Sequence, residues 1–268
     1  MLKHVFSSHI ALGFAQAGIA AALALVILFL ARRRQIHLES EIVIALVRGI
    51  TQISAVGFIL LLLLKGPQWT AVIMLSIMMV AAAFISSRRV KTIPGAYEVS
   101  LYGIVTGAGI VITLMTLAGV IDWAITSLIP VGSMLIANSM NSNSLALERF
   151  RSEVAGNVGQ IEAALSLGAS ASNTVNPYVQ NAFRASLIPA LDNLKSLGIV
   201  WIPGLMAGML LSGSPPIYAA IYQFVVIAMI FSASSITCLV STTLVRKRAF
   251  STNDQLVLRP ATATTRPL

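Results

Sequence analysis

Long apolar blocks separated by short polar stretches make up most of the sequence. Seven blocks can be delimited, and most reach the roughly 20 residues that a helix needs to cross about 30 Å of hydrocarbon. They cover residues 9–31, 42–64, 68–87, 97–120, 122–142, 196–214 and 217–245. The boundary between the fourth and fifth blocks is soft, whereas Pro215 and Pro216 break the helix between the sixth and seventh. The pattern predicts an all-α, polytopic membrane protein with about seven transmembrane helices.

One long stretch, residues 145–195, interrupts the apolar blocks. Apolar side chains recur in its first part at steps of three and four, which is typical of a helix with one buried face. They are Leu147, Phe150, Val154, Val158, Ile161 and Leu165. Gly168 is a natural helix end, residues 169–177 are interpreted as a polar connection, and residues 178–195 as a second helix that Pro189 disturbs. The pattern predicts a helical hairpin; the alternative is a surface hairpin that merely shields its own stripe.

Composition supports the membrane assignment, and the distribution of basic residues predicts the orientation of the chain in the membrane. Hydrophobic residues make up 57% of the chain and charged residues only 10%, against about a quarter in a soluble domain. Basic residues gather in alternate connections: Arg32, Arg33, Arg34, Arg88, Arg89, Lys91, Arg149, Arg151, Arg184, Lys195, Arg246, Lys247, Arg248, Arg259 and Arg266. The positive-inside rule then places the N-terminus outside and the C-terminus in the cytoplasm. The net charge of +9 is therefore a topology signal, and no nucleic-acid partner is expected.

These features predict a simple domain organisation. Residues 1–245 are expected to form a single transmembrane domain that includes the hairpin 145–195, and residues 246–268 a basic, disordered cytoplasmic tail. The first apolar block is too long for the core of a secretory signal and is followed by three arginines, so it is interpreted as a retained helix. We expect a multi-pass protein of the plasma membrane, which is the inner membrane in a bacterium.

Several kinds of chemistry have no support in the sequence. The single cysteine, Cys238, excludes an internal disulfide, and the three histidines (His4, His9 and His37) do not cluster, so metal ligands stay unknown. There is no G-x-x-x-x-G-K-[ST] nucleotide motif and no nucleophile beside a base. The chain is therefore expected to be neither an enzyme nor a self-energised pump, and to bind no cofactor itself.

The charged side chains in or near the spans can be interpreted either as structural groups or as parts of a substrate pathway. Arg48 and Gln52 are four residues apart and share one helix face. A charge near mid-bilayer costs about 2.5–3.5 kcal/mol, which marks a pathway candidate, but Arg48 can also reach the cytoplasmic headgroups as an anchor. Glu98 begins the fourth block, where an acid near a helix start is favoured, and is interpreted as a helix cap; the alternatives are that it pairs with Arg88 or Arg89 or belongs to a proton or metal path.

Other polar groups within the spans are further candidates for a substrate pathway. Asn138 and Met140 either line a polar cavity or mark where the fifth helix emerges from the membrane. Met206 lies in the sixth block as a soft potential ligand, and Tyr222 and Gln223 place polar groups in the last block. Each of these positions is assigned to the candidate pathway.

Glycine and proline mark two places of special helix geometry. Gly103 and Gly107 form a G-x-x-x-G motif, which allows two helices to approach closely. Pro203 and Gly204 break or kink the sixth block, and Gly204 and Gly208 repeat the glycine spacing. Broken helices are a recurrent way to build transporter sites, and a plain packing kink is the alternative.

The hairpin also carries a recognisable signature. Glu162-Ala163-Ala164, followed after three residues by Gly168, resembles the E-A-A-x-x-x-G motif of ABC transporter permeases. In those proteins the turn docks into a cleft of the ATPase subunit. The resemblance therefore implies that an ATPase couples to Glu162, Ala163, Ala164, Gly168, Ala169 and Ser170. The match is partial, because the later Ile-x-Leu-Pro would begin at Tyr178, whereas Ile188-Pro189 comes about ten residues further on.

Further motifs strengthen the resemblance. They are Arg48-Gly49-x-x-Gln52-x-x-x-Val56-Gly57, Asn138-x-Met140, Pro203-Gly204-x-Met206-x-Gly208 and Ser214-Pro215-x-x-Ala219-x-x-Tyr222-Gln223. With the hairpin signature, they resemble the FetB-like permease family, the membrane half of a bacterial iron exporter, to which plant aluminium-tolerance half-transporters also belong. The resemblance covers about residues 40–245 and departs at Leu205, where methionine is common.

This resemblance implies a permease without an ATPase domain of its own. Two copies of the permease would pair with two ATPase subunits, which use ATP and Mg²⁺, and the substrate exported from the cytoplasm would be iron or another metal. Some plant relatives are associated with a nucleotide sugar instead, and Arg48 suits an anion better than a bare cation. Two other classes stay open: an ion-gradient secondary transporter, and a non-transporting membrane scaffold whose hairpin binds another partner.

Overall fold

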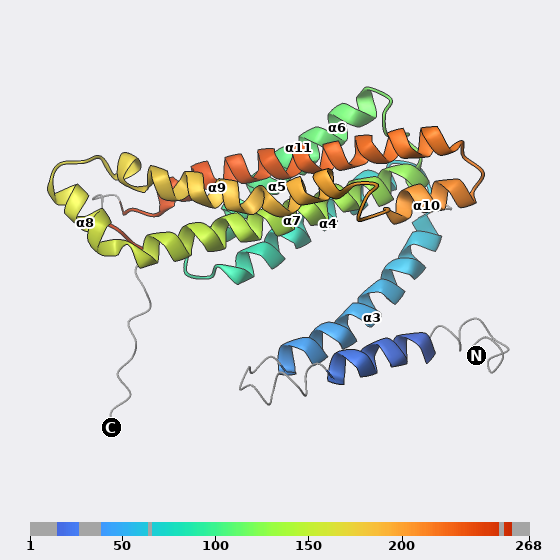
Figure 1. The fold of residues 1–268 in the computed structure, drawn as a ribbon, viewed down its shortest axis with the longest axis horizontal. Helices are drawn as coiled ribbons and strands as arrows, with labels where there is room; N and C mark the ends of the chain where they lie inside the picture. Colours follow the sequence, from blue (N-terminus) through green and yellow to red (C-terminus); the bar gives the residue numbers. More distant parts are fainter. Residues whose placement is uncertain (1–14, 27–38, 64–65, 252–254, 259–268) are drawn as a thin grey trace. The chain divides into compact units, whose positions relative to one another are not determined.

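The computed structural model describes residues 15–26, 39–63, 66–251 and 255–258 (Figure 1). Over these residues the chain is helical and forms no strand, so the predicted all-α class is confirmed. The chain divides into two units, Met1–Gly66 and Pro67–Leu268, which are described separately. The first unit contains the helix Ala15–Val26 and α3 (Glu39–Leu63). The arginines expected in the first loop and the last ten residues of the expected tail lie outside the described residues.

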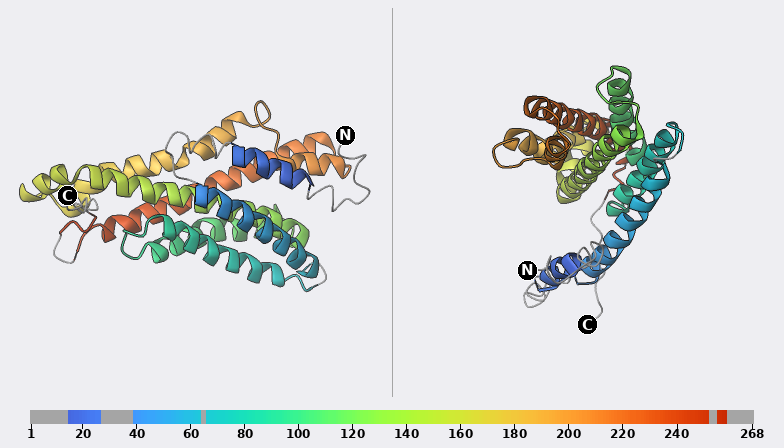
Figure 2. Two further views of the ribbon diagram at one scale, coloured as in Figure 1. Left: turned by 90° about the horizontal axis from the view of Figure 1, so that it is seen from below. Right: turned by 90° about the vertical axis from the view of Figure 1, so that its right-hand side faces the viewer.

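The second unit is built from helices that run along one another. Its elements are α4 (Thr70–Arg89), α5 (Ala96–Ile104), a π-helical turn η1 (Val105–Gly109), α6 (Ile110–Leu117), α7 (Ile125–Gly156), α8 (Val158–Ser166), α9 (Ala171–Ser196), α10 (Gly204–Leu211) and α11 (Pro216–Arg248). α7, α9 and α11 lie side by side, α4 packs on α5 and α7, and α5 packs on α11 (Figure 2). We call the end of this bundle that carries α8 the hairpin end; α10 lies at the other end (Figure 1).

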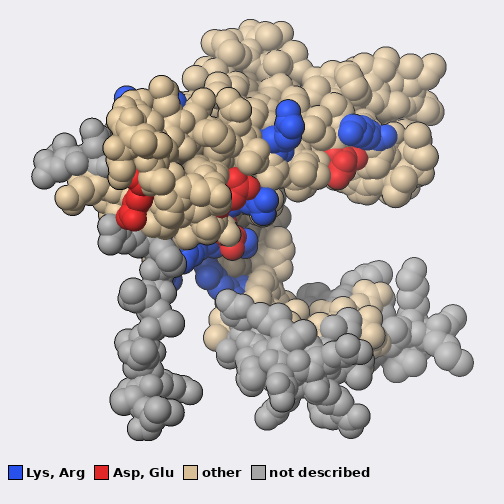
Figure 3. All heavy atoms as spheres, turned by 60° about the vertical axis from the view of Figure 1, so that its left-hand side comes forward, with Lys and Arg blue, Asp and Glu red and all other residues tan. Residues whose placement is uncertain are grey.

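Among the described residues, four helices are long and apolar enough to cross a membrane. They are Ile42–Leu61, Thr70–Arg89, Ala96–Leu117 and Pro216–Arg248. They correspond to the predicted second, third, fourth and seventh blocks, and confirm a polytopic membrane protein. Most of the described surface drawn in Figure 3 is uncharged, as a lipid-facing surface requires. The total of seven spans and the orientation of the chain stay predictions.

The fifth and sixth blocks do not fold as separate, complete spans. The fifth block forms the first part of α7, which continues to Gly156 as one helix of 32 residues. The sixth block, 196–214, is not one continuous helix: α9 ends at Ser196, and the chain then turns at Gly198, whose φ is +78°. Pro203 precedes α10, whose eight residues rise only about 12 Å. The structure thus has the break expected near Pro203, spread over residues 197–203.

The hairpin is present, but its limits differ from those predicted. The helix expected over 145–167 is continuous with the fifth block and is broken at Asn157, between α7 and α8. α9 begins at Ala171, so the expected polar connection 169–177 is mostly helix, and Pro177 and Pro189 lie inside α9. Helix propensity alone favours the predicted start of the second helix at residue 178, because Ser, Asn and Pro, which are common in residues 170–177, are poor helix formers. Burial of Val175 against Ile161 supplies the tertiary contact that extends the helix.

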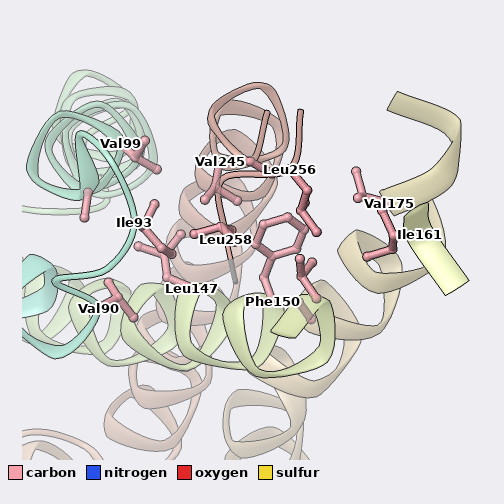
Figure 4. Packing of buried hydrophobic residues seen from close by; sticks show 14 residues of the cluster. Val90, Ile93, Val99, Leu147, Phe150, Ile161, Val175, Val245, Leu256 and Leu258 are labelled. Carbon is pink, nitrogen blue, oxygen red and sulfur yellow. The ribbon is translucent and has the colours of Figure 1, made fainter. Parts of the chain in front are cut away.

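The predicted apolar stripe packs into a core at the hairpin end, the hairpin cluster. Its buried members are Val90, Ile93, Ala96, Val99, Leu147, Phe150, Val154, Ile161, Val175, Ala182, Val245, Ala249, Leu256 and Leu258. Figure 4 shows the Phe150 ring pointing towards Leu256 and Leu258. Phe250 pairs with Leu256 in an antiparallel bridge. The prediction of a disordered tail from residue 246 is therefore wrong for residues 246–251 and 255–258.

The G-x-x-x-G motif lies where α5 and η1 cross α11. A Cβ atom built on Gly103 would collide with the Ser241 hydroxyl, and one built on Gly107 would collide with the Thr237 hydroxyl and lie 2.6 Å from the carbonyl oxygen of Ala233. Ala233, Thr237 and Ser241 follow one another at steps of four on α11. Small residues on both helices thus permit the backbones to approach closely, as the motif predicts.

We expect Gly107→Ala to destabilise the fold, whereas Gly109→Ala is tolerated. The new methyl group at position 107 meets backbone as well as the Thr237 side chain, and overpacking of this kind costs about 1–3 kcal/mol. The nearest atom to a Cβ at position 109 is Met79 Cε at 3.7 Å, an ordinary contact. Thermal unfolding of the two variants in detergent measures the difference; equal melting temperatures would contradict the close approach.

Candidate functional site

The turn between α8 and α9, residues 167–170, is fixed by its own backbone. The N–H of Ala169 donates to the carbonyl of Ala164, and the N–H of Gly168 donates to the carbonyl of Leu165, both at 3.0 Å. These two bonds form a Schellman motif, which satisfies the last carbonyls of α8. Gly168 takes the left-handed conformation that the motif requires, with φ at +87°, and a Cβ atom built on it would meet no atom within 4 Å outside its own chain neighbours. The turn is therefore well defined and unobstructed.

Most of the expected coupling residues lie on the surface of this hairpin turn. Glu162, Ala163, Gly168, Ala169 and Ser170 are exposed, and Ala164 is half-buried. The side chain of Leu167 is 89% exposed, although leucine normally gains about 1.5–3 kcal/mol when buried. Sequence reasoning did not single out Leu167, since it falls in an unspecified position of the signature. Leu167 thus places an apolar side chain at the tip of the turn, where it is accessible to another molecule.

Hydrogen bonds join the two helices of the hairpin. Arg149 Nε contacts Glu153 Oε1 at 2.8 Å within α7, and Asn181 Nδ2 of α9 donates to Glu153 Oε2 at 3.2 Å. Asn157, at the break between α7 and α8, donates through Nδ2 to the carbonyl of Glu153 at 2.8 Å. Together with the hairpin cluster, these bonds fix the hairpin turn to the long helices α7 and α9.

The start of α5 is tied to the end of α11 by charge. Glu98 lies in the first turn of α5, where an acid was expected, and it makes no capping hydrogen bond among the described residues. It pairs with Arg248, so the alternative of pairing with Arg88 or Arg89 is wrong. Arg88 instead lies over the Phe84 ring, with its guanidinium carbon 4.4 Å from the ring centroid. Lys and Arg side chains from the ends of α4, α7 and α11 thus surround the hairpin cluster, at one end of the second unit.

At the opposite end, the structure brings two pathway candidates together. The backbone N–H of Met206 in α10 donates to Gln223 Oε1 of α11 at 3.2 Å. The Gln223 side chain is only 1% exposed, and its Nε2 has no hydrogen-bond partner among the described residues. Pro203 is buried at the start of α10, whereas Gly204 and Gly208 are exposed. An amide buried with a free donor is costly unless a partner is supplied, so Gln223 can bind a polar group.

Three other pathway candidates make local contacts. Tyr222 is half-buried and stacks on Tyr218, with ring centroids 6.2 Å apart. Asn138 donates through Nδ2 to the Met134 carbonyl at 2.8 Å, one turn earlier on α7. The carbonyl of Met140 accepts from the Ser144 hydroxyl at 2.9 Å. No hydrogen bond between described residues joins Asn138 or Met140 to Gln223, so the structure does not bring these candidates into one site.

Arg48 and Gln52 lie on α3, in the other unit. Both side chains are exposed and share one face of the helix. Because the two units are not placed relative to one another, these residues are described on α3 alone. Their membership of the pathway stays a prediction.

A buried asparagine that sequence reasoning missed lies at the centre of the bundle. Asn143 of α7 donates through Nδ2 to the hydroxyl of Ser86 on α4 at 2.7 Å and to that of Ser100 on α5 at 2.9 Å. The hydroxyls of Ser144 and Ser86 also share a hydrogen bond, at 3.0 Å. All these side chains are buried, and the Oδ1 atom of Asn143 has no partner among the described residues. The run Ser142-Asn143-Ser144 was the available signal, but it falls beyond the predicted end of the fifth span.

The described residues offer oxygen and sulfur ligands rather than a clustered metal site. No three His, Cys, Asp or Glu side chains come together within the described part of the chain. Buried oxygen atoms without a partner there are those of Ser139, Asn143, Ser234 and Thr237.

Comparison with known proteins identifies the class to which this fold and site belong. Residues 14–250 match the uncharacterised protein family UPF0014. The chain belongs to this family and is a multi-pass protein of the plasma membrane. No solved structure matches the chain.

Individual relatives carry more specific names. The chain is 31% identical to the UPF0014 membrane protein YjkA of Bacillus subtilis (strain 168), over 87% of this chain and 93% of the relative. It is 28% identical to the probable iron export permease protein FetB of Escherichia coli (strain K12), over 90% of this chain and 93% of FetB. It is 29% identical to the protein ALUMINUM SENSITIVE 3 of Arabidopsis thaliana, over 88% of each chain. The suspected resemblance to FetB-like permeases is confirmed.

We expect Asn143→Leu to destabilise the bundle more than Asn138→Leu. The first change leaves the buried Ser100 hydroxyl without this donor and removes one of the two hydrogen-bond partners of Ser86, at a cost of about 1–3 kcal/mol for a buried group left without a partner. The second breaks only a bond to the chain's own helix. Melting temperatures in detergent compare the variants, and a smaller effect at position 143 would show that these bonds do not hold α4, α5 and α7 together.

Proposed function

We propose that this chain is the membrane-spanning permease subunit of an ABC-type exporter, driven by a separate ATPase. The carrying observation is the hairpin turn, which combines the E-A-A-x-x-x-G spacing with an ordered backbone and an 89% exposed leucine. Family membership and the name of the relative FetB agree with a transport role. In this proposal the chain is a transport subunit rather than an enzyme, and ATP and Mg²⁺ are used by the partner.

The fold offers a direct path from the turn into the membrane. α7 and α9 both run from the hairpin end along the bundle, and both pack on α11 over much of their length (Figure 2). The hairpin cluster joins the turn of the hairpin to the ends of α5 and α11. Because a packed core shifts as a unit rather than deforming gradually, movement of the turn would move these helices together. Closure of two ATPase subunits would supply that movement in a complex with two permeases.

We propose iron, or another metal, as the exported substrate. The name of FetB, probable iron export permease protein, supports this choice. The pathway would include Gln223, with its free buried amide, beside the N-terminus of α10, and Arg48, Gln52, Asn138 and Met140 elsewhere along it. The competing substrate is a nucleotide sugar or another small anion, which is favoured by Arg48 in an apolar helix.

The coupling proposal is tested with the double variant Glu162→Arg/Gly168→Trp. We expect it to insert into the membrane but to lose stimulation of the ATPase and export, because the turn no longer fits the partner. A suitable control is Gly213→Trp, since Gly213 also has a left-handed backbone (φ +90°) and open space around it. Co-purification and ATPase activity in proteoliposomes measure the effect. Normal export by the double variant would exclude the hairpin turn as the point of coupling.

The substrate is tested by reconstituting the permease with its ATPase and measuring ATP hydrolysis over a panel of metal ions and nucleotide sugars. We expect iron to give the largest stimulation, and Gln223→Leu to reduce it several-fold by removing the buried amide. Stimulation by nucleotide sugars with no response to any metal would replace the metal by the anionic substrate. A proton gradient that drives transport without ATP would exclude the ABC-type mechanism.

A further inference from the structure

A cleft of about 800 Å³ lies between the hairpin turn and the end of α11. We call it the basic cleft. One wall is formed by Leu165 and residues 168–172, and the other by Arg246, Lys247, Phe250 and Ser251. The second wall belongs to the segment that the sequence predicted to be a disordered tail. Residues widely separated in the sequence thus enclose a space large enough for several side chains.

The charge of the basic cleft favours an anionic occupant. Arg246 and Lys247 line it, and none of its described lining residues is acidic. The Nε atom of Arg246 is buried and has no hydrogen-bond partner among the described residues. α9 begins at Ala171 in the opposite wall, and the first N–H groups of a helix have no carbonyl partner within it and favour negative charge. Two side-chain cations and a helix N-terminus therefore converge on one space.

The position of the basic cleft favours a protein over the lipid surface. The hairpin turn is separated from the fifth apolar block by the last turns of α7, where Glu148, Arg149, Arg151 and Glu153 lie. A stretch with four charges lies outside the hydrocarbon. The cleft is also continuous with the surface that we assign to the ATPase, because Gly168, Ala169 and Ser170 belong to both.

We propose that the basic cleft receives an acidic segment of the ATPase subunit. This inference rests on the proposed function and adds a second element to it. The turn, with Leu167 at its tip, would enter the ATPase, while an acidic side chain of the ATPase would enter the permease between α9 and α11. Such reciprocal insertion fixes the orientation of the two subunits, and the charges select the matching ATPase.

The test compares two variants that carry the same change of charge. Arg246→Glu/Lys247→Glu reverses the cleft, and the control Arg89→Glu/Lys91→Glu reverses two exposed cations at the same end of the bundle. Arg248 is left intact because it pairs with Glu98. Affinity is measured with detergent-purified permease and the purified ATPase that it stimulates. We expect the cleft variant to weaken binding tenfold or more, the control to change it less than threefold, and rising salt to weaken the wild-type complex.

A charge-swap experiment adds specificity. In the ATPase, acidic surface residues are changed to lysine one at a time, and one such variant should restore binding to Arg246→Glu/Lys247→Glu. The milder Arg246→Gln/Lys247→Gln should lie between the wild type and the reversed variant, and it guards against misfolding caused by charge reversal. Melting temperatures of all variants are compared with that of the wild type.

Wild-type ATPase affinity in the reversed variant would overturn the inference while leaving the proposed function intact. If that variant also loses binding to phosphatidylglycerol vesicles, the cleft is assigned to lipid headgroups instead. If the wild-type permease neither binds nor stimulates an ATPase, the proposed function itself fails, and the inference fails with it.

Discussion

The burial of Phe150 among residues from five separate helices is the interaction on which the hairpin end depends. Its ring is fully buried, and the cluster around it joins α5, α7, α8, α9 and α11 to residues 255–258. A phenylalanine in such a place contributes about 3–5 kcal/mol compared with alanine. Without it, the cluster that holds Ile161 of α8 would lose its largest buried side chain. The exposed turn can be rigid because the opposite faces of its helices are so well packed.

Deeper in the bundle, polar contacts take over from apolar ones. A membrane span cannot use the hydrophobic effect to choose its neighbours, because lipid is as apolar as leucine. Specific bonds from Asn143 to Ser86 and Ser100, and the close contact of Gly107 with Thr237, therefore define which helices meet. Several polar atoms in this region, such as Thr237 Oγ1, remain without partners among the described residues. This balance suits a bundle that must hold together and yet change its packing during transport.

The parts of this architecture that depend on residues close together in the sequence could be predicted from the sequence. The period of three and four residues from Leu147 to Leu165 identified the buried face of the hairpin, and Gly168 identified its turn. The start of α9 and the order of residues 255–258 could not be predicted, because both depend on burial against distant parts of the chain. Asn143 was missed for a similar reason. Polar residues at the end of an apolar block are typical of a helix that leaves the membrane, so the sequence alone does not show that this one is buried between helices.

In the candidate site, too, local features could be predicted from the sequence and contacts between distant residues could not. The E-A-A-x-x-x-G signature could be found in the sequence because its residues are contiguous. Pro203 and Gly204 likewise predicted the break before α10. The partners of individual side chains could not be predicted from the sequence. Glu98, for example, pairs with Arg248 near the end of the chain and not with Arg88 or Arg89, which are nearer in the sequence. Short-range rules find elements and motifs, whereas contacts between elements require the fold.

The return of residues 255–258 to the hairpin cluster has a consequence for the order of folding. Leu147, Phe150 and Ile161 are synthesised before α9, α10 and α11, yet their burial is completed by Leu256 and Leu258. During synthesis the hairpin therefore passes through a period in which its apolar stripe is only partly covered. Such uncovered surface is a binding site for chaperones and a risk for aggregation.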